Sequence, residues 1–132
     1  MKNRWRSSKT AKYNLGYHLI WCVKYRRKVL LNDIEVFFKK LMLEKAQEIN
    51  VVIEQMEIMP DHIHIFVKAP PTYAPHFIVQ QFKGYTSKFL RSNFRSLKSR
   101  LPTLWTRSYY VESVGHISES TIKRYIEDQK GK

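Results

Sequence analysis

The sequence predicts an α+β fold in which an antiparallel four-stranded sheet carries two helices on one face and a further helix follows at the C-terminus. Two observations lead to this prediction. Stretches with apolar residues at every second position, typical of strands, alternate with stretches at helical spacing, in the order β-α-β-β-α-β-α. The chain of 132 residues, of which 43% are hydrophobic, is also long enough for one compact domain with its own core.

The first half of the chain is predicted to hold three strands and one helix. Alternating residues indicate a long strand over residues 13–25. Asn32 is expected to cap the helix that follows, with Glu35 as its capping-box partner. Residues 51–59 and 62–67 then form two strands joined by a tight turn.

The second half is predicted to contain two helices and the last strand. Pro75 can open a helix whose buried stripe consists of Ile78, Phe82, Tyr85 and Phe89. Residues 92–103 are expected to form a basic loop, residues 105–114 the fourth strand, and residues 117–130 a C-terminal helix capped by Ser118. This order is the split βαβ arrangement of ferredoxin-like and RRM-like domains, in which the first and third strands lie side by side in the middle of the sheet.

The net charge of +13 is concentrated in two parts of the chain. Residues 1–28 hold nine Lys and Arg, residues 62–111 hold eight, and neither block contains an acid. Residues 1–12 show no periodicity, so we expect a flexible basic arm ahead of the domain. Blocks of this kind predict a polyanionic partner, for which nucleic acid is favoured over an acidic membrane surface.

Composition excludes several other classes of protein. Cys22 is the only cysteine, which rules out a disulfide within the chain and a cysteine-rich zinc site. The sequence contains neither an apolar run long enough to cross a bilayer nor a signal-peptide core. We therefore expect a single domain over residues 1–132, located in the cytoplasm and not in a membrane.

The stretch Pro60–Val67 contains a candidate metal site. Alternation along a strand places His62 and His64 on the same face, two residues apart, where both imidazoles can bind one cation. The alternative is a pair of histidines on a half-exposed sheet face. The last helix offers a third ligand, because Tyr125 and Gln129 are separated by one turn and share a face.

These ligand types indicate the chemistry. Two imidazoles, one amide oxygen and open positions suit Mg²⁺ or Mn²⁺ bound to a phosphate substrate better than structural zinc. A tyrosine beside such a metal can act as a nucleophile. The alternative for Tyr125 is an amphipathic tyrosine that covers the core.

The motifs together resemble the single-tyrosine HUH transposases of small prokaryotic insertion sequences, the IS200-like family. The resemblance spans residues 13–129 and includes the opening strand from Tyr17 to Arg27. Its most specific parts are Met59-Pro60-Asp61-His62-Ile63-His64, a late Ser113-Val114-Gly115 and a helix with Tyr125-x-x-x-Gln129. The resemblance implies that His62, His64 and Gln129 are metal ligands and that Tyr125 is the catalytic nucleophile.

The resemblance also implies a substrate and an assembly. The substrate would be single-stranded DNA with hairpins at the element ends, cleaved and rejoined through a 5′-phosphotyrosine intermediate without a nucleotide cofactor. The family works as a homodimer in which the last helix of one subunit completes the other subunit's site, with Gly115 placed as a hinge. Trp5 or Tyr73 could stack on bases. The DNA backbone would contact Arg4, Arg6, Lys9, Lys12, Lys88, Arg91 and Arg95.

Two other functions fit the same pattern. A domesticated tyrosine nuclease acting on palindromic chromosomal repeats would share the site and differ in its substrate. A non-catalytic RRM-like RNA-binding module would share the topology, but such modules stack bases on sheet aromatics where this sequence has His62 and His64. Formation of a covalent protein–DNA adduct distinguishes the enzymes from the binding module.

Overall fold

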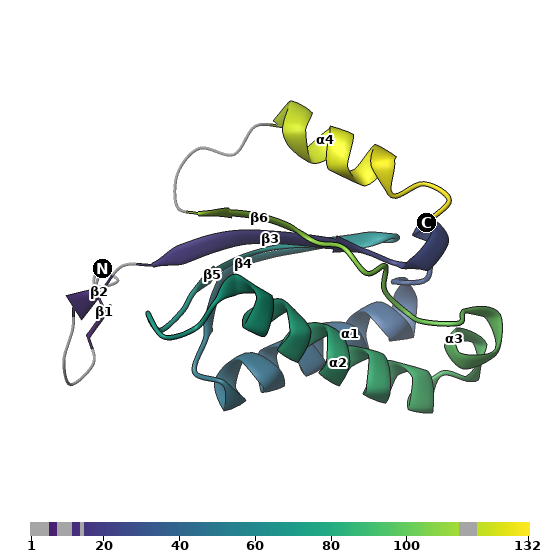
Figure 1. The fold of residues 1–132 in the computed structure, drawn as a ribbon. Coiled ribbons are helices and arrows are strands. Elements are labelled where there is room, and N and C mark those ends of the chain that lie inside the picture. The colour runs from purple at the N-terminus through teal and green to yellow at the C-terminus, as the bar shows by residue number, and fades with distance from the viewer. Residues whose placement is uncertain (1–5, 8–11, 14, 114–118) are drawn as a thin grey trace.

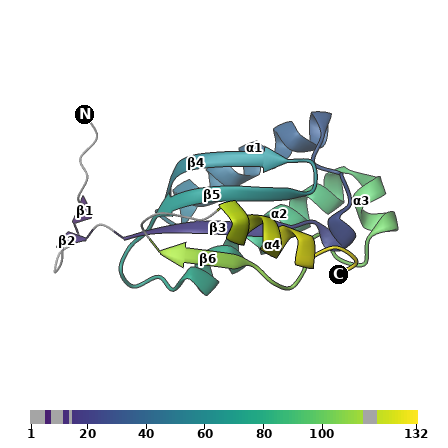
Figure 2. The same ribbon diagram turned by 90° about the horizontal axis from the view of Figure 1, so that it is seen from above.

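The sheet has the predicted antiparallel topology. A computed structural model describes residues 6–7, 12–13, 15–113 and 119–132. Four strands pair in the order β4-β5-β3-β6, so the first long strand and the histidine strand are central and adjacent (Figure 2). Their bounds are Gly16–Cys22 for β3, Val52–Met59 for β4, His62–Lys68 for β5 and Tyr110–Ser113 for β6.

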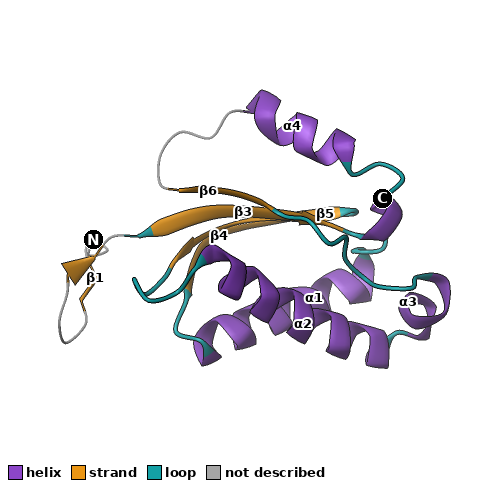
Figure 3. Ribbon diagram, viewed as in Figure 1, coloured by secondary structure: helices purple, strands orange, loops and turns teal. Residues whose placement is uncertain are grey.

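Helices cover both faces of this sheet. The helices α1 (Asn32–Glu48) and α2 (Pro75–Asn93) lie side by side on one face, as predicted (Figure 1). The C-terminal helix α4 (Glu119–Asp128) lies across the opposite face, above β3 and β6 (Figure 1, Figure 3). The sheet is therefore the middle layer, and any group on its α4 side is separated from α1 and α2 by the strands.

Burial along the strands follows this layering. In β5, Ile63, Ile65 and Val67 are fully buried, whereas the four residues that alternate with them are half-buried. This confirms the predicted period of two. In β3, by contrast, the four residues 19–22 are all fully buried, because the strand is central and has a packed layer on each face.

The start of α1 differs from the prediction. Leu31 is the N-cap residue, and no side chain caps the helix, so the prediction that Asn32 caps it with Glu35 is wrong. Asn32 instead has a positive φ of 52°, a conformation that asparagine tolerates better than most residues. The chain therefore enters the helix through a left-handed residue, and the backbone N–H groups of Ile34 and Glu35 donate to the Leu31 carbonyl.

The basic loop predicted over residues 92–103 contains a short helix, α3 (Arg95–Arg100). Leu97 anchors it in the core, and one apolar residue in six is too little periodicity to predict a helix. The ends of two strands also differ. β3 ends at Cys22 because the 3-10 turn η1 (Lys24–Arg26) follows it, and β6 begins at Tyr110 rather than at residue 105.

The N-terminal segment is partly structured. Its two-residue strands β1 (Arg6–Ser7) and β2 (Lys12–Tyr13) pair antiparallel. Three of these residues belong to the predicted arm, whereas Tyr13 was predicted to begin the long strand. Strands this short have no detectable alternation in a sequence. Among the helices that the structure describes, none combines the length and apolar character needed to cross a membrane.

Candidate functional site

The two histidines of β5 project from the sheet face that α4 covers. The residues directly opposite them on β3 are Cys22, paired with His62, and Ile20, paired with His64. Partners in an antiparallel sheet share a face, so both imidazoles and the Cys22 thiol lie on the α4 side. The backbone alternation thus brings His62 and His64 to one patch, as predicted.

Asp61 orients the first of these histidines. Its Oδ1 lies 2.7 Å from His62 Nδ1, and its Oδ2 accepts a bond of 3.1 Å from Arg26 Nε. Burial alone would raise the pKa of Asp61, but the hydrogen bonds from His62 and Arg26 hold it below its usual value. The carboxylate is therefore ionised and can only accept, so His62 Nδ1 carries the proton and Nε2 is left unprotonated, the form of nitrogen that can bind a cation.

Asp61→Asn is expected to weaken metal binding without unfolding the protein. An amide keeps the shape but removes the charge that fixes the His62 tautomer, and loss of such an outer partner typically costs about 10–100-fold in metal affinity. Titration with Mn²⁺, followed by paramagnetic resonance, measures the effect. Asp33→Asn, a change at an exposed carboxylate in the first turn of α1, is the control. Equal affinities for the Asp61 variant and the wild type would contradict this role.

A third imidazole joins the patch from β3. His18 Nδ1 lies 3.2 Å from His64 Nε2, and the rings contact at a centroid separation of 5.4 Å. Burial lowers the pKa of His64, helped by the charge of neighbouring His18, and burial likewise lowers the pKa of His18. The sequence predicts no role for His18, because its position beside His64 depends on the register of β3 against β5.

The nucleophile candidate and the third ligand candidate form a second group. Ser108 Oγ lies 3.0 Å from the Tyr125 hydroxyl and donates to Gln129 Oε1 at 2.9 Å. Burial raises the pKa of Tyr125 to about 12, although the bond with Ser108 opposes this. Tyr125 is therefore protonated near neutral pH. Ser108 was not predicted, because it lies inside the strand predicted over residues 105–114 and its partners are 17 and 21 residues away.

The two groups lie on the same sheet face, the one that α4 covers (Figure 1). Cys22, the register partner of His62, belongs to this face as well. Nowhere in the described part of the chain do three His, Cys, Asp or Glu side chains form a cation site. A metal held by His62 and His64 would therefore need a further ligand of another kind.

The predicted DNA contacts are spread over the molecule. Lys88 and Arg91 lie on α2 and Arg95 begins α3, in the layer opposite α4. Arg91 donates to the backbone carbonyls of Leu101 and Pro102 and so holds the chain after α3 in place.

The other predicted contacts come from the N-terminal segment and a loop. Arg6 and Lys12 belong to β1 and β2. Tyr73 packs on Phe77 with 4.9 Å between ring centroids. Arg4, Trp5, Lys9 and the proposed hinge Gly115 lie outside the described residues.

Comparison with known proteins decides the family. A family model described as IS200-like transposase matches residues 11–129. The chain belongs to the IS200-like transposase family. The ISDra2 transposase TnpA of Deinococcus radiodurans is 35% identical over 122 residues, which cover 91% of this chain and 87% of that protein. The IS200 transposase of Salmonella typhimurium is 29% identical over 90% of this chain and 79% of its own length.

Solved structures agree with this assignment of the IS200-like transposase family. A crystal structure of a chain described as a transposase from Deinococcus radiodurans superposes with a TM-score of 0.88 and 31% identity, covering 94% of this chain and 97% of the other. A REP-associated tyrosine transposase bound to a REP hairpin has a TM-score of 0.57 at 11% identity, covering 85% and 62% of the two chains. The second likeness supports the shared fold alone.

Proposed function

We propose that this transposase is a metal-dependent enzyme that cleaves and rejoins single-stranded DNA at hairpin-marked element ends, with Tyr125 as the nucleophile. The observation that carries the proposal is the shared sheet face, which holds the Asp61-oriented His62 and His64 together with the helix of Tyr125 and Gln129. The family's transposase activity and the hairpin bound by the REP-associated neighbour support it.

The metal ligands proposed are His62 Nε2, His64 and the Gln129 amide oxygen. A bound Mg²⁺ or Mn²⁺ would polarise the scissile phosphate and stabilise the charge that develops on its oxygens. The protein contributes the orientation: Asp61 fixes the His62 ring, and Arg26 fixes Asp61. His18 holds His64 Nε2 at 3.2 Å, so this bond is expected to break when His64 binds a cation.

The proposed reaction exchanges one phosphate ester for another. The Tyr125 oxygen attacks phosphorus, and the bond from phosphorus to the 3′-oxygen breaks. The products are a 5′-phosphotyrosine link and a free 3′-hydroxyl, and the phenolic proton balances the new hydroxyl. Reversal of this step on a different 3′-hydroxyl joins the strand to a target, so no external energy source is required.

The arrangement of α4 suits a resting state. The Tyr125 hydroxyl is protonated and bonded to Ser108, and Gln129 Oε1 is occupied by the same serine. Catalysis therefore requires that α4 deliver Tyr125 and Gln129 to a pair of histidines, either within one subunit or in the partner of a homodimer. The homodimer is part of the proposal, on the basis of the family resemblance.

The test is a denaturing gel of the protein incubated with a single-stranded oligonucleotide copied from the DNA that borders its gene. With Mg²⁺ or Mn²⁺ a covalent protein–DNA band should form, and a chelator should abolish it. Binding without a band under all metal conditions would favour the non-catalytic module. Identities of 35% and 31% to element transposases, against 11% to the REP-associated protein, favour the mobile enzyme over the domesticated nuclease.

A further inference from the structure

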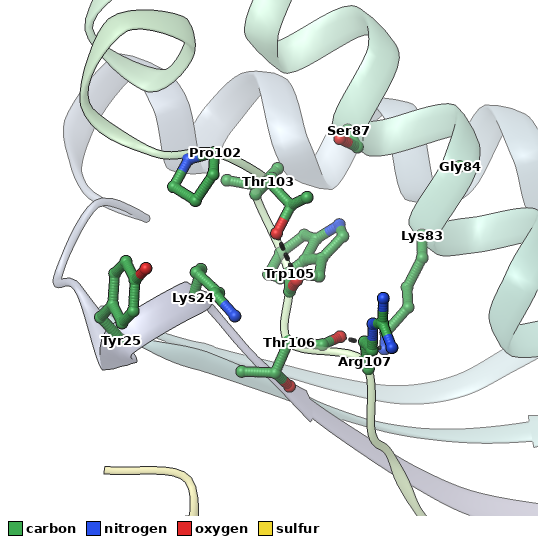
Figure 4. A pocket seen from close by; sticks show the side chains of 11 residues that line it. Lys24, Tyr25, Lys83, Gly84, Ser87, Pro102, Thr103, Trp105, Thr106 and Arg107 are labelled. Atoms are coloured by element: carbon green, nitrogen blue, oxygen red, sulfur yellow. Dashed lines mark hydrogen bonds between the residues drawn. The ribbon is translucent and has the colours of Figure 1, made fainter. Parts of the chain in front are cut away.

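A pocket of about 500 Å³ lies where the chain runs from α3 toward β6 (Figure 4). Its floor is the segment Pro102–Arg107, with η1 on one side and α2 on the other. None of the proposed metal ligands or the nucleophile lines this pocket. It is a separate feature that the proposed chemistry does not use.

The lining of the pocket is cationic. Lys24, Lys83 and Arg107 contribute three basic groups, and none of the eleven lining residues is acidic. Ser87 and Thr103 add hydroxyls. Tyr25, a residue that is 44% exposed, contributes an aromatic ring, and Lys24 Nζ lies over this ring at 5.2 Å from its centroid. An acid-free pocket with several cations, hydroxyls and an accessible aromatic face has the chemistry that binds the phosphates and bases of a single strand.

Lys83 connects this pocket to the nucleophile. Its ammonium donates to the backbone carbonyl of Thr106 at 2.7 Å and to that of Ser108 at 2.8 Å. Burial lowers the pKa of Lys83 to about 8, so it remains mainly charged at neutral pH. The segment 106–108 therefore joins the pocket to the nucleophile. Arg107 faces the pocket, while Ser108 bonds to Tyr125 and Gln129.

We propose that the pocket formed by Lys24, Lys83 and Arg107 binds a phosphate of the DNA strand next to the scissile bond. The proposal rests on the function proposed above, and it assigns the strand a path. A DNA strand lying along Pro102–Ser108 places one phosphate against Arg107 and Lys24. The same DNA strand then continues toward Ser108 and Tyr125. The ring of Tyr25 is then available to stack on the base that follows.

Lys83 is hydrogen-bonded to two backbone carbonyls, so this path is tested by substituting the other two cationic side chains, Lys24 and Arg107. Arg107→Ala, and Lys24→Ala combined with it, should weaken binding of a short fluorescein-labelled oligothymidylate. The slope of log affinity against log salt should fall by roughly 0.7 for one cation and about 1.4 for two. Lys39→Ala with Lys40→Ala on exposed α1 is the charge-matched control. Arg107→Lys should restore most of the slope, and thermal unfolding checks that the variants are folded.

Phosphates whose charge has been removed show which position of the DNA strand contacts the pocket. In the oligonucleotide of the adduct assay, single methylphosphonates are placed in turn on each side of the cleaved bond. At one position, the methylphosphonate should weaken DNA binding by the wild type to the level of Arg107→Ala. The same methylphosphonate should not weaken binding by Arg107→Ala any further. If no position does so, or if the α1 pair lowers the salt slope as much as the pocket pair, the pocket does not bind the strand. Formation of an adduct by the wild type in the same assay shows separately whether the proposed function holds.

Discussion

Tyr125→Phe should abolish the covalent protein–DNA adduct and lower strand cleavage by roughly 10⁴-fold or more, because no other hydroxyl takes its place as nucleophile. Binding of single-stranded DNA should be unchanged. Phenylalanine retains the ring contact with Tyr110, at 5.9 Å between centroids, and loses the hydroxyl that bonds to Ser108. The adduct is measured on a denaturing gel and the binding by fluorescence anisotropy.

Tyr110→Phe is the matched control for this variant. Tyr110 lies on β6, contacts the Tyr125 ring, and its hydroxyl bonds to Glu112 at 3.1 Å. Its loss removes a phenol from the same face without touching the proposed nucleophile, so the adduct should persist. An adduct that survives Tyr125→Phe and is lost in Tyr110→Phe would mean that Tyr110, and not Tyr125, is the nucleophile.

His64→Ala should remove metal-dependent cleavage altogether, since a single imidazole and an amide cannot hold a divalent ion firmly. We expect a loss of at least about 100-fold in Mn²⁺ affinity and no detectable adduct. Calorimetric titration with Mn²⁺ and the adduct gel measure the two effects. His76→Ala, at an exposed position of α2, should leave both unchanged. Cleavage by His64→Ala at the wild-type rate would exclude this histidine as a ligand.

The pH dependence follows from the same groups. Burial lowers the pKa of His64, so its neutral, metal-binding form persists as the pH falls below 6.5 and is lost only on further acidification. The pKa of Tyr125, near 12, means that its ionised fraction increases with pH throughout the neutral range. Cleavage should therefore decline below about pH 6 and rise toward alkaline pH. A rate that is flat between about pH 5 and pH 8 would contradict metal ligation by these histidines.

The sequence predicts the sheet and its topology because the alternation in β5 reflects burial directly. Ile63, Ile65 and Val67 are fully buried, and the histidines alternate with them. It does not predict α3, in which only Leu97 is anchored in the core. Nor does it predict Asn32 at a positive φ, since an asparagine before an acidic turn is equally typical of a cap.

The sequence likewise predicts only part of the candidate site. Residues joined by local spacing, His62 with His64 and Tyr125 with Gln129, were identified because strand and helix periods determine which side chains share a face. Ser108 was missed because its partners are 17 and 21 residues away. The long-range pairings of His18 with His64 and of Arg26 with Asp61 also depend on strand register and turn geometry, which no local pattern contains.

The most direct test of a tyrosine-linked, histidine- and metal-dependent cleavage uses one hairpin-bearing oligonucleotide labelled at either end. With Mg²⁺, label at the 3′ end should appear on the protein, label at the 5′ end should appear on a released strand with a 3′-hydroxyl, and mass spectrometry should find the phosphate on Tyr125. Chelator should remove both products. A 5′-labelled adduct, or a phosphate on a different residue, would contradict the account.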